Sequence, residues 1–175
     1  MKLKTIIFSF GIFYSFAAAA QDLPQKEKTF IDIVSAAISQ SDNAKNDMQR
    51  GGIKARRDDG VCSALKKRAV SDWVGKVTTI DSNSDGKGVI EIEVADNITL
   101  KTWNNSLSDI SDHTLIDPRS KLFEKASMLS VGDSVKFSGE FFRGAESCIE
   151  EASMSLRGGL EEPEFIFRFK DITKI

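Results

Sequence analysis

The two cysteines of the chain, Cys62 and Cys148, are its first candidates for chemistry. Cys62 is soon followed by three consecutive basic residues, Lys66, Lys67 and Arg68, and nearby cations favour the reactive thiolate. A thiol-dependent enzyme based on Cys62 is therefore one hypothesis. The favoured interpretation is a disulfide, because Cys148 is the one available partner and the N-terminus predicts export to an oxidising compartment.

The single histidine, His113, lies in "SDISDHTLID" with several aspartates beside it. A Ser–His–Asp site needs a histidine that is oriented by a third group and aimed at an activated hydroxyl, and the sequence has no G-x-S-x-G motif. We predict that His113 lies on a polar loop. One histidine and two distant cysteines also make no recognisable zinc site. The expectation is therefore no catalytic residue, no cofactor and no enzyme.

The segment "DSNSDGKGVIEIE" resembles the first half of a calcium-binding loop, with Asp81, Asn83 and Asp85 in alternation. Alternate oxygen ligands followed by a glycine suit a hard cation. The twelfth position, however, is Ile92 instead of a bidentate glutamate. The flanking residues also alternate like strands, so the favoured interpretation is a hairpin loop and the calcium site is a weak alternative.

Basic residues concentrate between residues 54 and 68, at Lys54, Arg56, Arg57, Lys66, Lys67 and Arg68. A basic segment near an aromatic side chain such as Trp73 predicts binding of single-stranded nucleic acid. Three aspartates dilute the cluster, namely Asp58, Asp59 and Asp72. The chain is also acidic overall, with a formal net charge of −2, which disfavours counterion-driven binding. Nucleic-acid binding is therefore the alternative function.

The segment "LKTWNNSLSD" gives the leading candidate for a ligand surface. Alternation places Leu100 and Thr102 on one face of a strand and Lys101 and Trp103 on the other. If the first face is the core, Trp103 lies toward a binding face together with Asn104 and Asn105. Such a surface suits a protein, peptide or glycan partner. The alternative is that Trp103 covers the end of the barrel and is buried.

The first twenty residues have the layout of a secretory signal peptide. "MKLK" is basic, "TIIFSFGIFYSF" is apolar, and "AAAA" supplies small residues for cleavage before Gln21. The apolar run is shorter than the roughly 20 residues that span a bilayer. We therefore expect residues 1–20 to be removed and the protein to be periplasmic or secreted, without membrane insertion.

Residues 25–50 are predicted to form a helix with one apolar stripe. Its members are Phe30, Ile33, Val34, Ala37 and Ile38. The stripe could bind a partner, but packing on the protein's own core is the favoured interpretation. "GG" at residues 51–52 predicts a break, after which "IKARRDDG" leads to Cys62 as a hinge. Residues 21–61 would then form an N-terminal helical arm and residues 62–175 a barrel domain.

From residue 71 onward the apolar period changes to two, as in strands. A helix interrupts the strands, with Asp117 as its N-cap and Pro118 at its first position. Gly75 and Gly139 lie inside two of the strands and suit tight coiling. The expected strands are residues 73–80, 89–94, 98–103, 134–142, 148–156 and 165–172. This order predicts an α+β, mainly β fold: a small Greek-key OB-like barrel of five to six strands with a helix between strands 3 and 4.

Four segments also resemble a known type of domain. They are "WVGKV", "LKTWNN", "LSVGDSVKFSG" and "PEFIFRFKDI". They resemble the OB-like domain of uncharacterised exported bacterial proteins, over about residues 70–175. Related OB-like domains are grouped with the anticodon-binding type, which implies a nucleic-acid-binding role. The resemblance supplies no catalytic residues.

Overall fold

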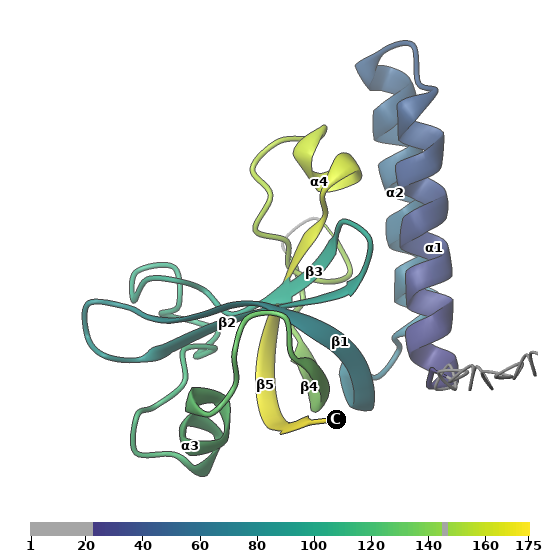
Figure 1. Cartoon of the computed structure of the whole chain (residues 1–175). Coiled ribbons are helices and arrows are strands. Elements are labelled where there is room, and N and C mark those ends of the chain that lie inside the picture. Colours follow the sequence, from purple (N-terminus) through teal and green to yellow (C-terminus); the bar gives the residue numbers. More distant parts are fainter. Residues whose placement is uncertain (1–22, 145–146) are drawn as a thin grey trace, which may run out of the picture.

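The computed structural model describes residues 23–144 and 147–175, so the predicted signal peptide lies outside the described residues. Two long helices stand beside a five-stranded sheet that closes on itself in a ring (Figure 1). The class is α+β, as expected. The elements in chain order are α1 (Gln25–Asp42), α2 (Asp47–Ala64), β1 (Ala69–Ser82), β2 (Gly88–Ala95), β3 (Ile98–Lys101), α3 (Lys121–Ser127), β4 (Ser134–Phe141), α4 (Gly158–Glu161) and β5 (Glu164–Lys174).

The strands follow the order β1-β2-β3-β5-β4 around the ring, and β4 pairs back onto β1. All neighbours are antiparallel except β3 and β5, which run parallel over three residue pairs. The ring closes because β1 is long enough to pair with β2 through its second half and with β4 through its first half. Side chains along β3 alternate between the core and the outer face as predicted, and Ile98, Leu100 and the following Thr102 are fully buried.

Glycines permit the close strand approach that this curvature needs. A Cβ at Gly139 would overlap the Arg168 carbonyl oxygen and the Phe167 ring, and one at Gly75 would overlap Ile92 and the Glu93 carbonyl. Real side chains do not tolerate such overlaps. The prediction that both glycines serve tight coiling is therefore confirmed by their surroundings.

The N-terminal region forms two helices where one was predicted. The break lies at residues 43–46, where the Asn46 side chain caps α2 by accepting from the Gln49 N–H at 3.1 Å. The prediction of a break at residues 51–52 is wrong, because both glycines lie inside α2. The expected hinge at "IKARRDDG" is also helical, and Cys62 lies in the last turn of α2.

Helix α1 closes one end of the ring. Phe30 is fully buried, and its ring centroid lies 5.4 Å from that of Trp73, 5.6 Å from Phe141 and 5.2 Å from Phe165. These three partners come from β1, β4 and β5, so the helix extends the core of the ring. Packing of the apolar stripe on the protein's own core is confirmed.

One buried carboxyl ties α1 to the ring. Glu27 has no exposed surface, and its two carboxyl oxygens accept from the Val74 N–H at 2.9 and 3.1 Å. Burial raises the pKa of Glu27 to about 7. The hydrogen bond from Val74 lowers this pKa, but by less than burial raises it. Val74 follows a bulge in β1, where Asp72 has a positive φ of 61°.

Helix α3 lies at the other end of the ring (Figure 1). It follows β3 and precedes β4 along the chain, as predicted. It begins later than expected, because its N-cap is Ser120, which accepts from the Phe123 N–H at 3.1 Å. The prediction of Asp117 as the cap is therefore wrong. Asp117 instead accepts from the Arg119 N–H in the preceding turn, at 2.9 Å.

The connection from β4 to β5 is an irregular segment that contains the short helix α4. A strand at residues 148–156 was predicted, but it is absent: a single bridge joins Glu151 to Phe165 in this region. The alternation of Ala152, Met154 and Leu156 was misleading, since Met154 is completely exposed. Arg57 of α2 anchors the segment instead, donating to the Glu151 carboxylate at 2.6 Å and to the Gly159 carbonyl at 2.5 Å.

The predicted disulfide joins Cys62 to Cys148, with the two Cα atoms 5.2 Å apart. It fastens the end of α2 to the segment between β4 and β5. No helix in the described part of the chain is long and apolar enough to cross a membrane.

Candidate functional site

The loop between β3 and α3 is held in one shape by a buried carboxylate. Asp109 accepts from the Thr114 N–H at 2.5 Å, the Thr114 hydroxyl at 2.7 Å and the Leu115 N–H at 3.2 Å. Two α-type turns, from Asn105 to Asp109 and from Asp109 to His113, complete the framework. A loop with its polar groups satisfied internally presents its remaining side chains in fixed positions.

Two large apolar side chains project from this framework into solvent. Leu107 is 80% exposed and Ile110 is 64% exposed. They lie three residues apart across a helix-like turn, so they share one side of it. Asn104 and Asn105 are exposed beside them. We call Asn104, Asn105, Leu107 and Ile110 the loop surface.

Trp103 supports the loop surface instead of projecting from it. The side chain is half-buried, and its indole N–H donates to the Asp112 carboxylate at 2.8 Å. Its backbone N–H donates to the Thr114 hydroxyl at 2.8 Å. Trp103 is thus neither the fully buried plug of one hypothesis nor a free stacking ring.

Lys101 lies on the outer face of the ring, as its place in the alternation predicted. Its ammonium lies 2.7 Å from the Glu91 carboxylate and 3.1 Å from that of Glu164. Burial acts to lower the pKa of Lys101, but hydrogen bonds to both glutamates raise it overall. Lys101 therefore links β2, β3 and β5 and contributes little to the loop surface.

The hairpin between β1 and β2 holds the loop surface in position through hydrogen bonds to Ser106. The Asn83 amide donates to the Ser106 hydroxyl at 3.3 Å, and that hydroxyl donates to Asp85 at 2.5 Å. The Asn83 side-chain oxygen also accepts from the Asp85 and Lys87 N–H groups. Asp81 accepts from the neighbouring Ser82 N–H. The antiparallel pairing of β1 with β2 up to Ser82 and Gly88 confirms the hairpin interpretation.

The predicted basic patch separates into three parts. Lys54 and Arg57 form ion pairs with Asp58 and Glu151. The Arg57 side chain is almost fully buried, and its Cζ lies 5.6 Å from the centroid of the Phe165 ring. These two cations hold α2 against the segment between β4 and β5, and their charges are neutralised by internal carboxylates.

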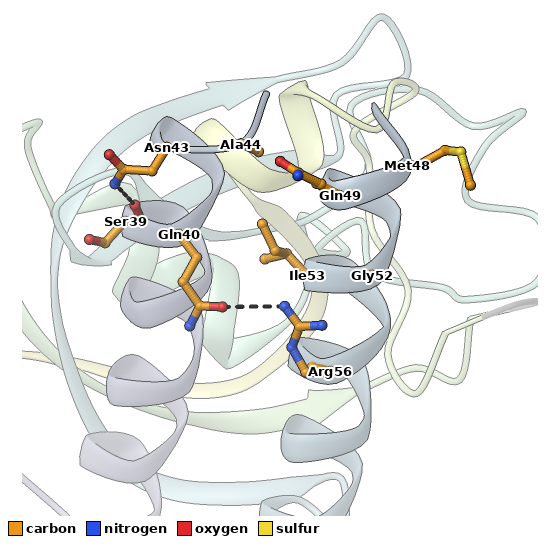
Figure 2. Close-up of a pocket in the computed structure, with 9 residues that line it drawn as sticks. All are labelled: Ser39, Gln40, Asn43, Ala44, Met48, Gln49, Gly52, Ile53 and Arg56. Carbon is orange, nitrogen blue, oxygen red and sulfur yellow. Dashed lines mark hydrogen bonds between the residues drawn. The ribbon is translucent and has the colours of Figure 1, made fainter. Parts of the chain in front are cut away.

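Arg56 lies apart from the other cations, in a cavity of about 590 Å³ between the facing ends of α1 and α2. Figure 2 shows the Gln40 amide directed toward the Arg56 guanidinium across this gap, at 3.5 Å. The other lining residues are uncharged, and Met48 points outward with 90% of its surface exposed. One guanidinium among amides makes this cavity an unpromising site for chemistry.

The remaining three cations, Lys66, Lys67 and Arg68, line a groove of about 560 Å³ where β1 begins and β4 ends. The fold adds two further cations to them, Arg143 and Arg168. We call this the basic groove; it is lined by Lys66, Lys67, Arg68, Ala69, Glu140, Phe141, Phe142, Arg143 and Arg168.

Other candidates for chemistry do not come together in the described residues. Trp73 is only 1% exposed, so the hypothesis that it stacks on a base is wrong. His113 is exposed on the loop with a positive φ of 50°. Residues 23–144 and 147–175 contain no group of three or more metal-ligating side chains. Cys62 is bonded to Cys148, which removes the free thiol that a thiol-dependent enzyme needs.

Sequence reasoning missed four residues of the two surfaces. Leu107 and Ile110 are apolar residues in an otherwise polar loop, and this was a usable signal. Arg168 alternates with core phenylalanines in β5, which places it on the outer face of the ring. Nothing in the sequence relates Arg143 to Lys67, because only the pairing of β4 with β1 brings them together.

The chain was compared with models of known protein families and with curated proteins. Neither comparison finds a match.

Proposed function

We propose that this protein is an exported, non-catalytic binding module built on an OB-like Greek-key barrel. The strand order β1-β2-β3-β5-β4, with a parallel pair β3-β5 and a helix between β3 and β4, supports the OB-like assignment. The signal-peptide pattern of residues 1–20 and the Cys62–Cys148 disulfide support export. The partner is a protein or peptide, which binds the loop surface.

The observation that carries this proposal is the exposure of Leu107 and Ile110 on a rigid loop. Large apolar side chains held in fixed positions lose little entropy on binding and act as anchors. The exposed amides of Asn104 and Asn105 supply polar contacts around them, as the rim of a protein interface does. A glycan is less suited, because Trp103, the nearest aromatic ring, is held against Asp112.

The test is capture of partners from the native exported fraction with the purified protein as bait. We expect a partner that the parent protein retains and that the double variant Leu107→Ser/Ile110→Ser loses by at least tenfold. The matched control is Met48→Ser, which removes an even more exposed apolar side chain, near the start of α2. Equal retention by the double variant and the control would show that the loop surface is not the binding site.

A further inference from the structure

The basic groove is a second surface, separate from the loop surface and formed by three parts of the chain. The segment after α2 contributes Lys66, Lys67 and Arg68, the end of β4 leads to Arg143, and β5 contributes Arg168. Five cationic side chains thus face one groove in a chain whose formal net charge is −2. Such a local concentration opposes the overall charge and indicates a local anionic ligand.

Four of these cations have no carboxylate partner among the described residues. The ion pairs found in residues 23–144 and 147–175 include none that involves Lys66, Lys67, Arg68 or Arg143. This differs from Lys54 and Arg57, which internal carboxylates neutralise. The charge of the groove is therefore presented outward.

The fifth cation is held in position from three sides. Arg168 pairs with Glu140, which also lies 2.8 Å from the Lys170 ammonium. Hydrogen bonds from Lys170 and, to a smaller extent, from Arg168 lower the pKa of Glu140, so its carboxylate stays ionised. Arg168 also donates to the Asp112 carbonyl at 3.3 Å, and its Cζ lies 5.2 Å from the centroid of the Phe142 ring. Both Nη groups of Arg168 are used by Glu140 and the Asp112 carbonyl, so Arg168 fixes one wall of the groove and the other four cations supply its unpaired charge.

We propose that the basic groove binds a glycan chain that carries sulfate or phosphate groups. Two lysines and two arginines without a described carboxylate partner, Lys66, Lys67, Arg68 and Arg143, line one concave site and suit several such groups spaced along one chain. The half-buried Phe142 is the one aromatic side chain of the lining with exposed surface, and the part of its ring that Arg168 does not cover can contact one sugar ring.

The same lining disfavours the other large anions. Single-stranded nucleic acid needs a series of exposed aromatic rings on which bases stack, whereas Phe142 is a single ring beside Arg168 and Trp73 is buried. An acidic protein needs pockets for apolar anchors, and the remaining apolar lining is Ala69 and the buried Phe141.

The test is titration calorimetry of the mature, disulfide-bonded protein with a sulfated oligosaccharide and with its desulfated counterpart. We expect binding of the sulfated chain alone, with an affinity that falls as salt rises because counterions are released. The double variant Lys67→Glu/Arg143→Glu should lose affinity at least tenfold. The control Lys26→Glu/Lys45→Glu makes the same charge change on two exposed residues, one in α1 and one in the turn between α1 and α2, and should leave affinity unchanged.

Three results would overturn the proposal: no binding of the sulfated chain, equal loss in both charge variants, or tighter binding of a single-stranded oligonucleotide of equal charge. The outcome is independent of the function proposed for the loop surface, since Leu107→Ser/Ile110→Ser should bind the sulfated chain like the parent protein. All substituted side chains are exposed, so thermal unfolding is expected to confirm an intact fold in each variant.

Discussion

Replacing Glu27 with glutamine should stabilise the protein at neutral and alkaline pH. The carboxyl is fully buried, and burial raises its pKa from 4.5 to about 7. Between these two values the folded state keeps a proton that the unfolded state has released. The free energy of unfolding therefore falls as pH rises from 4.5 to 7, and the loss stays constant above pH 7.

The magnitude follows from the two pKa values. Each unit of difference corresponds to about 1.4 kcal/mol, so ionising Glu27 lowers the free energy of unfolding by about 3 kcal/mol at pH 8. Glutamine stays neutral, and its side-chain oxygen can still accept from the Val74 N–H. The variant should match the parent protein at pH 4 and exceed its stability by up to about 3 kcal/mol at pH 8.

The assay is urea unfolding of both proteins, in the oxidised form, at several pH values between 4 and 8. Glu124→Gln is the matched control, because it removes a carboxylate from the exposed side of α3. A stability difference between Glu27→Gln and the parent protein that does not grow with pH would refute the reasoning. So would an equal pH dependence in the Glu124→Gln control.

Three further predictions concern the fold. Reduction of the Cys62–Cys148 disulfide, which spans 86 residues, should lower the free energy of unfolding by about 4 to 5 kcal/mol on the loop-entropy account, measured by urea unfolding with and without reductant; an unchanged midpoint would contradict this. Gly139→Ala should lower it by about 1 to 3 kcal/mol, because the new Cβ overlaps Phe167 and the neighbouring strand. A Cβ at Gly51 of α2 would meet no neighbouring atom. Gly51→Ala should therefore raise the free energy of unfolding by roughly 0.5 to 1 kcal/mol in the same assay. If Gly51→Ala lowered the free energy of unfolding as much as Gly139→Ala does, the steric explanation would be refuted.

The strands were predictable where one face is buried along the whole element. In β4 every second residue enters the core, and in β5 Phe165, Phe167 and Phe169 do, so alternation identifies both strands. The same signal failed at residues 148–156, because a short alternating run also occurs by chance in a loop. There the segment is fixed by Arg57 and the disulfide, which are long-range contacts that local periodicity does not report.

The helix boundary was missed because glycine was given too much weight. Gly51 and Gly52 lower helix propensity by roughly 1 kcal/mol each, but burial of Ile53, Arg57 and Val61 on the same helix outweighs this loss. The capping residue Asn46 was the better signal. Of the candidate surfaces, the exposed amides of the loop surface and the cations Lys66, Lys67 and Arg68 of the basic groove were predicted, whereas joining these cations to Arg143 required knowledge of which strands are neighbours.

The parallel pairing of β3 with β5 has a consequence for how the chain reaches its folded state. Because β5 is the last strand and lies between β3 and β4, the ring cannot close until almost the entire chain has been made. Until then β3 and β4 keep open edges that can pair with other chains. Closure also joins residues about 65 positions apart, a slow, non-local step. We therefore expect a chain truncated before residue 164 to aggregate instead of forming a smaller stable domain.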